Sequence, residues 1–252
     1  MLKPKSLIFN KLQTLVVAGA GILLGLGVIE TNSAQAALIN GSFEQGFKGF
    51  STIGDASIKT AAFGSGPTDG NKQALLTNGF GSVSDANLEK FLELNAGILD
   101  TIGIGDATGG SALQQTFTAN AGDVLSFKFN FLTNEFTPEF EFNDFAFVSL
   151  TGIDTLADTF SDFVSTITPF DAETGFGTFS QTISVSGTYS LGIGIVDLED
   201  KIVDSGLLVD NIKLKSVPEP ITILGSLAAL GFGAMFRRTR QNSKMKSNFS
   251  RG

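Results

Sequence analysis

Acidic side chains gather in residues 134–145, where the chain reads Asn-Glu-Phe-Thr-Pro-Glu-Phe-Glu-Phe-Asn-Asp-Phe. Most glycoside hydrolases cleave the glycosidic bond with paired carboxylates, one acting as the acid and the other as nucleophile or base. Glu135 and Asp144 would be that pair in this chain. The run also lies between two expected strands, so its carboxylates can equally form the solvated rim of a hairpin. The sequence shows neither a buried cleft nor the separation of the two carboxyl groups, and both interpretations stay open.

The same run resembles the Glu…Phe-Asn-Asp-x-Phe segment of exported bacterial sandwich domains that occur with assorted surface anchors. In a loop of this kind Glu135, Asn143 and Asp144 could hold a divalent cation, because calcium takes oxygen ligands from carboxylates and amides. A further acidic run extends from Asp197 to Asp204. It falls in an expected loop, and we expect it to be solvated.

Two short motifs, residues 40–44 (Asn-Gly-Ser-Phe-Glu) and residues 210–214 (Asp-Asn-Ile-Lys-Leu), resemble the two ends of the galactose-binding-like jelly roll. Many carbohydrate-binding modules have this fold. The resemblance implies that the two motifs lie side by side as strands. It also implies that Glu44 and Asp210, with nearby backbone carbonyls, hold a structural calcium ion. Without metal, Glu44 could cap a turn and Asp210 could bind a neighbouring backbone amide.

The aromatic residues give little sign of a platform on which a sugar ring could stack. Modules of this kind usually stack a pyranose on Trp or Tyr, whereas this chain has no Trp and one Tyr. We expect Tyr189 in the core or on the sheet surface. Phe47 or Phe50 stands where many such modules have Trp.

Missing residue types exclude several kinds of chemistry. The chain has no Cys and no His, which rules out disulfides, thiolate or imidazole metal sites and a Ser-His-Asp triad. Residues 37–216 hold 8 Lys and no Arg against 23 Asp plus Glu. Such an acidic domain would be repelled by nucleic acid. Its acidity fits a solvated surface and also the binding of divalent cations.

These side chains must be positioned by β-strands, because period-two patterns dominate residues 37–216. Residues 124–132 alternate apolar and polar side chains, which indicates a strand with one buried face. Residues 145–150 are apolar on both faces, which is typical of a central strand. Further strands are expected at residues 111–118, 178–185, 189–196 and 207–214. The pattern predicts an all-β antiparallel β-sandwich of jelly-roll type.

Two local sequence signals predict a turn and a helix. Residues 186–188 (Ser-Gly-Thr) separate two expected strands and predict a hairpin connection. Asp85 precedes apolar residues at helical spacing, which predicts one short helix with Asp85 as its cap.

The N-terminal residues have the order of a secretory signal peptide. Three lysines within the first eleven residues precede an apolar run at 12–29, and Ala34 and Ala36 form a small-x-small cleavage site. Signal peptidase would then leave Ala37 as the first residue of the mature chain. A first transmembrane helix is the alternative.

The C-terminal tail begins Val217, Pro218, Glu219 and Pro220, continues as an apolar run to residue 236, and ends in a cluster of Arg237, Arg238 and Arg240. As a helix the apolar run would rise about 24 Å, a little short of the hydrocarbon core, which the flanking residues can complete. The arginines would hold the C-terminus in the cytoplasm. A buried core helix with a basic tail is the alternative.

This order of motifs resembles the PEP-CTERM sorting signal of bacteria that make extracellular polysaccharide. The resemblance implies that an exosortase, a membrane cysteine transpeptidase, cuts near the Pro-Glu-Pro motif and releases or transfers the ectodomain. It describes the sorting of the protein and leaves its biochemical activity open.

The sequence therefore predicts a signal peptide (1–36), a β-sandwich ectodomain (37–216), a sorting signal (217–240) with a transmembrane helix at 220–236, and a basic cytoplasmic tail (241–252). We expect an exported, membrane-tethered, non-catalytic protein that binds polysaccharide or acts structurally at the cell surface or in the extracellular matrix. A glycoside hydrolase and a pure adhesin or coat component are the alternatives. Expected partners are signal peptidase, exosortase, the membrane and extracellular polysaccharide, with calcium as the expected cofactor and no nucleic acid.

Overall fold

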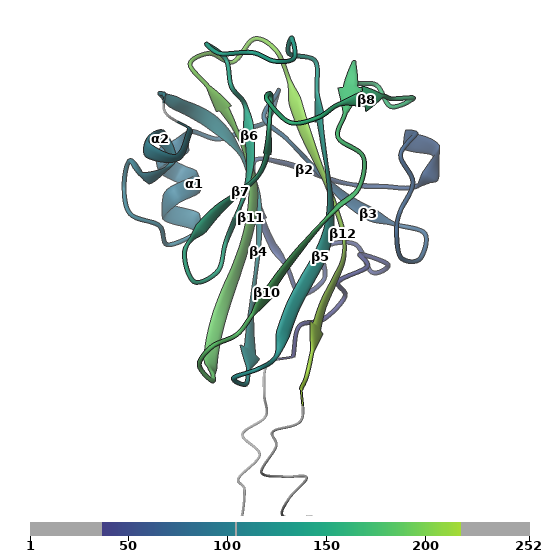
Figure 1. Ribbon diagram of the computed structural model, residues 1–252, viewed down its shortest axis with the longest axis vertical. Coiled ribbons are helices and arrows are strands. Elements are labelled where there is room, and N and C mark those ends of the chain that lie inside the picture. The colour runs from purple at the N-terminus through teal and green to yellow at the C-terminus, as the bar shows by residue number, and fades with distance from the viewer. Residues whose placement is uncertain (1–36, 104, 218–252) are drawn as a thin grey trace, which may run out of the picture. The chain divides into compact units, whose positions relative to one another are not determined.

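Two antiparallel β-sheets make up the part of the chain that the computed structural model describes, residues 37–103 and 105–217 (Figure 1). The first sheet has five strands in the order β1 (Ser51–Ile53), β4 (Ala107–Ala119), β11 (Gly187–Leu198), β6 (Phe145–Ser149) and β7 (Ile153–Asp158). The second has seven, in the order β2 (Asp55–Lys59), β3 (Gln73–Thr77), β12 (Ser205–Lys215), β5 (Val124–Thr133), β9 (Ala172–Glu173) and β8 (Val164–Ser165), with β10 (Gly177–Thr182) also paired to β5. The expected all-β antiparallel architecture is confirmed, and a strand covers most of each expected strand segment.

Alternation along the strands places the main core between the two sheets. Phe127 and Phe131 of β5 point into this core, as the period-two pattern predicted. Strand β6 is buried on both faces, with Val148 in the inter-sheet core and Phe147 on the opposite face. Burying one such Phe side chain contributes about 1.5–3 kcal/mol. The phenylalanines thus supply much of the packing that a chain without disulfides needs.

A helical hairpin covers part of the outer face of the five-stranded sheet. Leu88 and Leu92, from the first helix and its C-terminal end, pack with Leu99 of the second helix against Phe147 and Val196 of the sheet. The hairpin consists of α1 (Asp85–Phe91) and α2 (Ile98–Gly103), and a short 3-10 helix, η1 (Ala61–Phe63), lies elsewhere in the chain.

The prediction of one helix capped by Asp85 is therefore wrong in two respects. Ser84 is the N-cap, because its backbone is still extended (φ −63°, ψ 153°), and Asp85 already lies in the first turn. The helix α2 spans six residues. It is too short to show a 3.6-residue period, so the sequence pattern did not reveal it.

The predicted hairpin at residues 186–188 is also wrong. Strand β10 pairs with β5 in one sheet, whereas β11 pairs with β4 and β6 in the other. The connection therefore crosses between the sheets. The start of β11 pairs with the end of β4, whereas Phe179 of β10 stacks on Phe127 of β5 with ring centroids 5.0 Å apart.

The opening motif at residues 40–44 forms turns rather than the expected strand. Asn40 and Phe43 both have a positive φ of 55°, which a strand does not allow. The motif nevertheless lies beside β12, as the resemblance implied, because the Ile212 amide donates a 2.9 Å hydrogen bond to the Gly41 carbonyl.

The expected signal peptide, the Pro-Glu-Pro motif, the apolar run and the arginine cluster lie outside the described residues, as do Ala34 and Ala36. At the borders of the described part, Ala37 and Val217 are exposed and belong to no helix or strand. Within residues 37–103 and 105–217, no helix has both the length and the hydropathy that a membrane crossing requires.

Candidate functional site

Glu44 follows the opening turn and holds the loop formed by residues 64–72. Its Oε1 accepts hydrogen bonds from the Asn71 amide at 2.6 Å and the Lys72 amide at 2.8 Å. This approach requires Gly70, which has a φ of +74° and whose Cβ, if present, would lie 2.4 Å from Oε1. Glu44 thus does what was expected of it in the absence of metal, namely to cap a turn.

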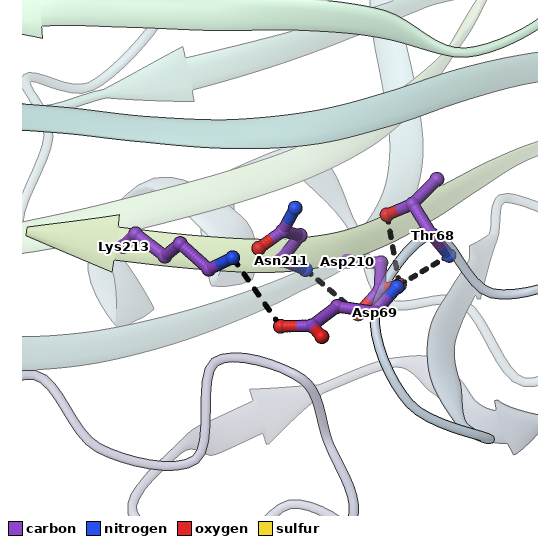
Figure 2. Close-up of polar contacts among 5 residues, drawn as sticks. All are labelled: Thr68, Asp69, Asp210, Asn211 and Lys213. Atoms are coloured by element: carbon purple, nitrogen blue, oxygen red, sulfur yellow. Dashed lines mark hydrogen bonds and ion pairs between the residues drawn. The ribbon is translucent and has the colours of Figure 1, made fainter.

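Asp210 holds the same loop from strand β12 (Figure 2). Its side chain is fully buried. Oδ2 accepts hydrogen bonds from the Thr68 amide at 2.6 Å, the Thr68 hydroxyl at 2.9 Å and the Asp69 amide at 2.7 Å. Burial raises the pKa of Asp210, and these hydrogen bonds oppose the rise. The nearby Lys213–Asp69 ion pair, 3.4 Å long, is solvent-exposed, so it adds little.

The residues around Asp210 fit a calcium ion in one respect. Asn211 has a positive φ of 57° within an irregularity of strand β12. Its side-chain oxygen Oδ1 is buried and has no hydrogen-bond partner among the described residues. An unpartnered amide oxygen next to a buried carboxylate is a donor set that calcium uses. Within the described part of the chain, however, no three acidic side chains are arranged as a ready metal-binding group.

Of the second predicted cation site, Glu135, Asn143 and Asp144, only Glu135 and Asp144 have side chains that interact. Asp144 is fully buried, and its Oδ2 accepts a 2.7 Å hydrogen bond from the side-chain amide of Asn78. Glu135 is 8% exposed and lies close enough to Asp144 for the two charges to interact. Asn143 is engaged elsewhere, since its Oδ1 accepts hydrogen bonds from the amide and hydroxyl of Thr159 at 3.1 and 2.8 Å.

Asp197 joins these carboxylates instead. The prediction that it belongs to a solvated loop is wrong, because β11 continues to Leu198 and Asp197 is only 2% exposed. The Leu198 amide donates a 3.1 Å hydrogen bond to Oδ1 of Asp144, so the ends of β11 and β6 meet here. Oδ1 of Asp197 is buried and has no partner among the residues that the structure describes. We call Glu135, Asp144, Asp197 and Asp200 the acidic cluster.

Electrostatics in the acidic cluster favour protonation. Burial raises the pKa of Glu135 to about 7, and repulsion from Asp144 and Asp200 adds to the effect. Burial also raises the pKa of Asp144 to about 6, against the hydrogen bond from Asn78. The pKa of Asp197 is raised to about 8, first by burial and then by repulsion from the other three carboxylates.

The geometry argues against the glycosidase pair. A raised pKa would suit Glu135 as a general acid, but Asp144 is fully buried and each of its oxygens already accepts a hydrogen bond. Neither residue lines the cavity of about 550 Å³ or the one of about 370 Å³ among the described residues. The buried Asp144 is therefore poorly placed to act as a nucleophile or base on a sugar bond.

A cleft of about 550 Å³ opens on the outer face of the five-stranded sheet, between the helical hairpin, the β6–β7 turn and the start of β11. Its apolar lining consists of Leu92, Leu94, Ile98, Ile102, Leu150 and Ile153. Its polar lining includes Glu93, Asn95, Ser149, Thr188 and Ser190. We call this cavity the hairpin cleft.

Small residues of β11 shape the floor of the hairpin cleft. A Cβ at Gly192 would lie 2.3 Å from Oγ of Ser149 and 2.8 Å from Cδ2 of Leu92, so only glycine lets the hairpin sit this close to the sheet. Two positions earlier on the same face, Oγ of Ser190 is buried and has no hydrogen-bond partner among the described residues. At the rim, Glu93 has a positive φ of 58°.

Tyr189, Phe47 and Phe50 are all partly buried, and Tyr189 is among the residues that line the hairpin cleft. The ring of Tyr189 stacks on Phe117 of the inter-sheet core, with centroids 6.0 Å apart, and its hydroxyl donates to the Val185 carbonyl. Phe47 and Phe50 pack on the buried Phe43, at centroid distances of 6.0 and 5.0 Å. The expectation that Tyr189 belongs to the core or the sheet is confirmed.

Sequence reasoning missed Asn78, Asp197 and Ser190. Asn78 joins the two sheets at the acidic cluster, since its amide donates to Asp144 while its oxygen accepts a 2.6 Å hydrogen bond from the Ser205 amide. The period-two pattern of residues 189–196 continues to residue 197, which places Asp197 in the strand on the same face as its buried apolar residues. This pattern could have predicted that Asp197 is buried. Asn78 and Ser190 carry no such local signal.

Comparisons with known proteins leave the family of this chain open. No family model matches it, and no curated protein matches it. Among solved structures, the chain is similar to TmCBM61 in complex with beta-1,4-galactotriose, with 16% identity over 72% of this chain and 99% of that one and a TM-score of 0.40. It is also similar to a CBM4 structure (12% identity, 69% and 99% covered, TM-score 0.33) and to the N-terminal cellulose-binding domain of Cellulomonas fimi beta-1,4-glucanase C (14% identity, 73% and 99% covered, TM-score 0.30). At these identities and TM-scores the similarity concerns the general course of the chain and indicates no ligand.

Proposed function

We propose that this protein is a non-catalytic β-sandwich that binds a segment of extracellular polysaccharide in the hairpin cleft. The observation that carries the proposal is the cleft itself, which has about 550 Å³ of space and a buried Ser190 hydroxyl without a partner among the described residues. Its volume lies in the range of small-ligand sites. Apolar walls with a few hydroxyl, amide and carboxylate groups match the alternating apolar and hydroxylated surfaces of a sugar chain.

The arrangement of acidic groups supports binding rather than turnover. Glu93 is the one carboxylate that lines the hairpin cleft in the described part of the chain, whereas glycoside hydrolysis ordinarily needs two. The remaining candidates, Glu135 and Asp144, lie in the acidic cluster and line neither of the two cavities.

The test is a binding assay on the purified full chain against a glycan array and native polysaccharides, with calcium and again with chelator. Gly152 lines the cleft and has open space around it, so Gly152→Phe should fill the opening and weaken binding at least about tenfold, which is about 1.4 kcal/mol. Gly187→Phe is the control: Gly187 does not line the cleft, and the nearest atom to its added Cβ would be Cε2 of Tyr189 at 3.9 Å, an ordinary van der Waals contact.

Equal affinities for the two variants would place the glycan elsewhere on the molecule. No binding to any glycan in either buffer would refute the proposal and favour a structural coat or adhesin component.

We also propose a structural calcium ion between Glu44, Asp210 and the loop of residues 64–72. The unpartnered Oδ1 of Asn211 supports it. Calcium should then raise the midpoint of thermal unfolding, and Glu44→Gln should reduce that rise while leaving the fold intact by circular dichroism. An identical rise in the variant would contradict calcium at this place.

Export and sorting are proposed from the sequence motifs alone. The mature chain should begin at Ala37 and appear in the membrane or extracellular fraction, and deleting residues 217–240 should abolish retention at the surface. Mass determination of the mature protein and cell fractionation test this. A chain that stays intact in the cytoplasm would contradict it.

A further inference from the structure

Four acidic side chains converge at one end of the sandwich, where β5, β6 and β11 come together. Val196 of β11 pairs with Phe145 of β6. Asp197 and Asp144 are neighbours of these paired residues, and the Leu198 amide binds Asp144 directly. The other two members of the acidic cluster lie on loops, Glu135 just after β5 and Asp200 just after β11.

The negative charge of the acidic cluster is poorly compensated by protein groups. In the described part of the chain the one ion pair joins Lys213 to Asp69, away from this cluster. Lys201 acts on Asp197, but more weakly than each of the three neighbouring carboxylates. Burying an unpaired carboxylate costs several kcal/mol, so a cluster of this kind needs a proton or a cation.

Asp197 supplies a second observation, independent of the number of acidic groups. It is 2% exposed, and its Oδ1 has no hydrogen-bond donor among the described residues. Asp144 beside it and Asp210 at the 64–72 loop are equally buried, but both have donors on both oxygens. Oδ1 of Asp197 is therefore a buried oxygen without a donor among the described residues, on a carboxylate close enough to three others for their charges to interact.

We propose that Asp197, Asp144 and Glu135 bind a divalent cation, with Asp200 as an outer carboxylate. This site is distinct from the calcium proposed at Glu44 and Asp210 and does not depend on glycan binding in the hairpin cleft. Compared with the set expected from the sequence, Asp197 takes the place of Asn143, whose oxygen is bound to Thr159.

Binding of the cation would require the loops that carry Glu135 and Asp200 to move toward Asp144 and Asp197. No three acidic side chains of the described residues form a ready metal-binding group, so the ligands must move to reach one ion. Asp197 lies in β11 and Asp144 directly precedes β6, whereas Glu135 and Asp200 lie on loops. Loops are in general more mobile than strands, so these two residues are the ones we expect to move. Calcium suits such a site better than magnesium, because it accepts irregular geometry and Mg²⁺ demands a near-ideal octahedron.

Isothermal titration of CaCl₂ into the chelator-treated full chain tests the proposal, with MgCl₂ as the comparison. Asp197→Asn should lose one equivalent of bound Ca²⁺ relative to the wild type. Asp154→Asn, which changes an exposed aspartate of β7, should keep it. Glu44→Gln should also keep this equivalent, which separates it from the ion proposed at the 64–72 loop.

Glu135→Gln provides a second variant in case Asp197→Asn does not fold, because Glu135 lies on a loop. It should weaken the same binding event at least about tenfold, or about 1.4 kcal/mol. Unchanged stoichiometry and affinity in both variants would overturn the proposal. So would the absence of any binding by the wild type at millimolar CaCl₂, which would mean that protons alone neutralise the acidic cluster.

Discussion

Individual buried carboxylates of this protein have very different surroundings. Asp210 receives hydrogen bonds on both oxygens from backbone amides, and so it holds a loop in place. Asp197 is equally buried but has one oxygen without a donor among the described residues. Since an unsatisfied buried charge is costly, the two aspartates should respond oppositely to loss of their charge.

The free energy of unfolding of the chelator-treated protein should fall as the pH rises from about 4 to about 8. Folding raises the pKa of Asp144 from 3.8 to about 6 and that of Asp197 from 3.8 to about 8. Within this interval the folded state therefore binds more protons than the unfolded chain, and stability decreases with pH. Lys201 opposes the shift of Asp197, while Glu135 and Asp200 reinforce it.

Urea unfolding at several pH values measures this dependence. Asp197→Asn should flatten it by removing the group with the highest pKa, and the exposed Asp154→Asn should not. Stability that rises over the interval would contradict the raised pKa values.

At the scale of elements, the helical hairpin depends on one buried glutamate. Glu89 of α1 is 3% exposed, and its carboxylate accepts hydrogen bonds from the Gly97 amide at 2.8 Å and the Leu99 amide at 3.1 Å. It thereby satisfies donors at the N-terminus of α2, which is too short to be stable alone.

Glu89→Ala should destabilise the protein by about 2–3 kcal/mol, because both amides lose a charged acceptor. Urea unfolding measures the loss, and Glu141→Ala on an exposed loop is the control. A loss below about 0.5 kcal/mol, as at ordinary surface positions, would show that water replaces the carboxylate.

At the C-terminal end of α1, by contrast, a substitution is expected to stabilise the protein. The Leu94 amide donates to the Glu89 carbonyl at 2.8 Å, and Glu93 occupies the left-handed position of this C-terminal motif with a φ of 58°. Glycine is preferred at that position.

Glu93→Gly should therefore stabilise the protein by up to about 1 kcal/mol. Because Glu93 also lines the hairpin cleft, the same variant should bind glycan more weakly. Thermal unfolding and the glycan assay on one preparation measure both effects. A destabilised variant would mean that the Glu93 side chain contributes more than its backbone strain costs.

At the scale of the whole molecule, the first and last segments of the described residues lie close together. Ala37 and Ser216 line the same cavity of about 370 Å³. Nearby, the Gly41 carbonyl is bound to the Ile212 amide. Residues far apart in sequence therefore close the sandwich, at a cost in loop-closure entropy that their contacts must offset.

Gly41→Ala should be strongly destabilising, because a Cβ at this position would lie 2.0 Å from the Ile212 carbonyl oxygen. Overpacking of this kind costs about 1–3 kcal/mol when the backbone must shift. Gly66→Ala is the control, since its nearest neighbour would be 3.5 Å away. A midpoint of thermal unfolding equal to that of the control would show that the opening segment moves freely away from β12.

Much of the fold could be predicted because a strand with one buried face has a local signal, the alternation of apolar and polar residues. In residues 124–132 each side chain points to the face opposite its neighbour's, so the buried Phe127 and Phe131 were readable from the alternation alone. The pairing of β10 and the helix α2 could not be predicted in this way. The pairing of β10 depends on contacts with β5, which lies far earlier in the chain, and α2 depends on a carboxylate from another helix.

By itself the sequence determined the all-β class, the Phe-rich core and the chemistry that the absence of Cys and His excludes, because each of these follows from residue type and local period. Only the tertiary structure decided that Asp197 and not Asn143 joins Glu135 and Asp144, and that a cleft lies between the helical hairpin and β11. Those features depend on contacts between separate segments of the chain, as between Asp144 and Leu198, which are 54 residues apart. No local pattern records such contacts, since they depend on how the sheets pair and pack.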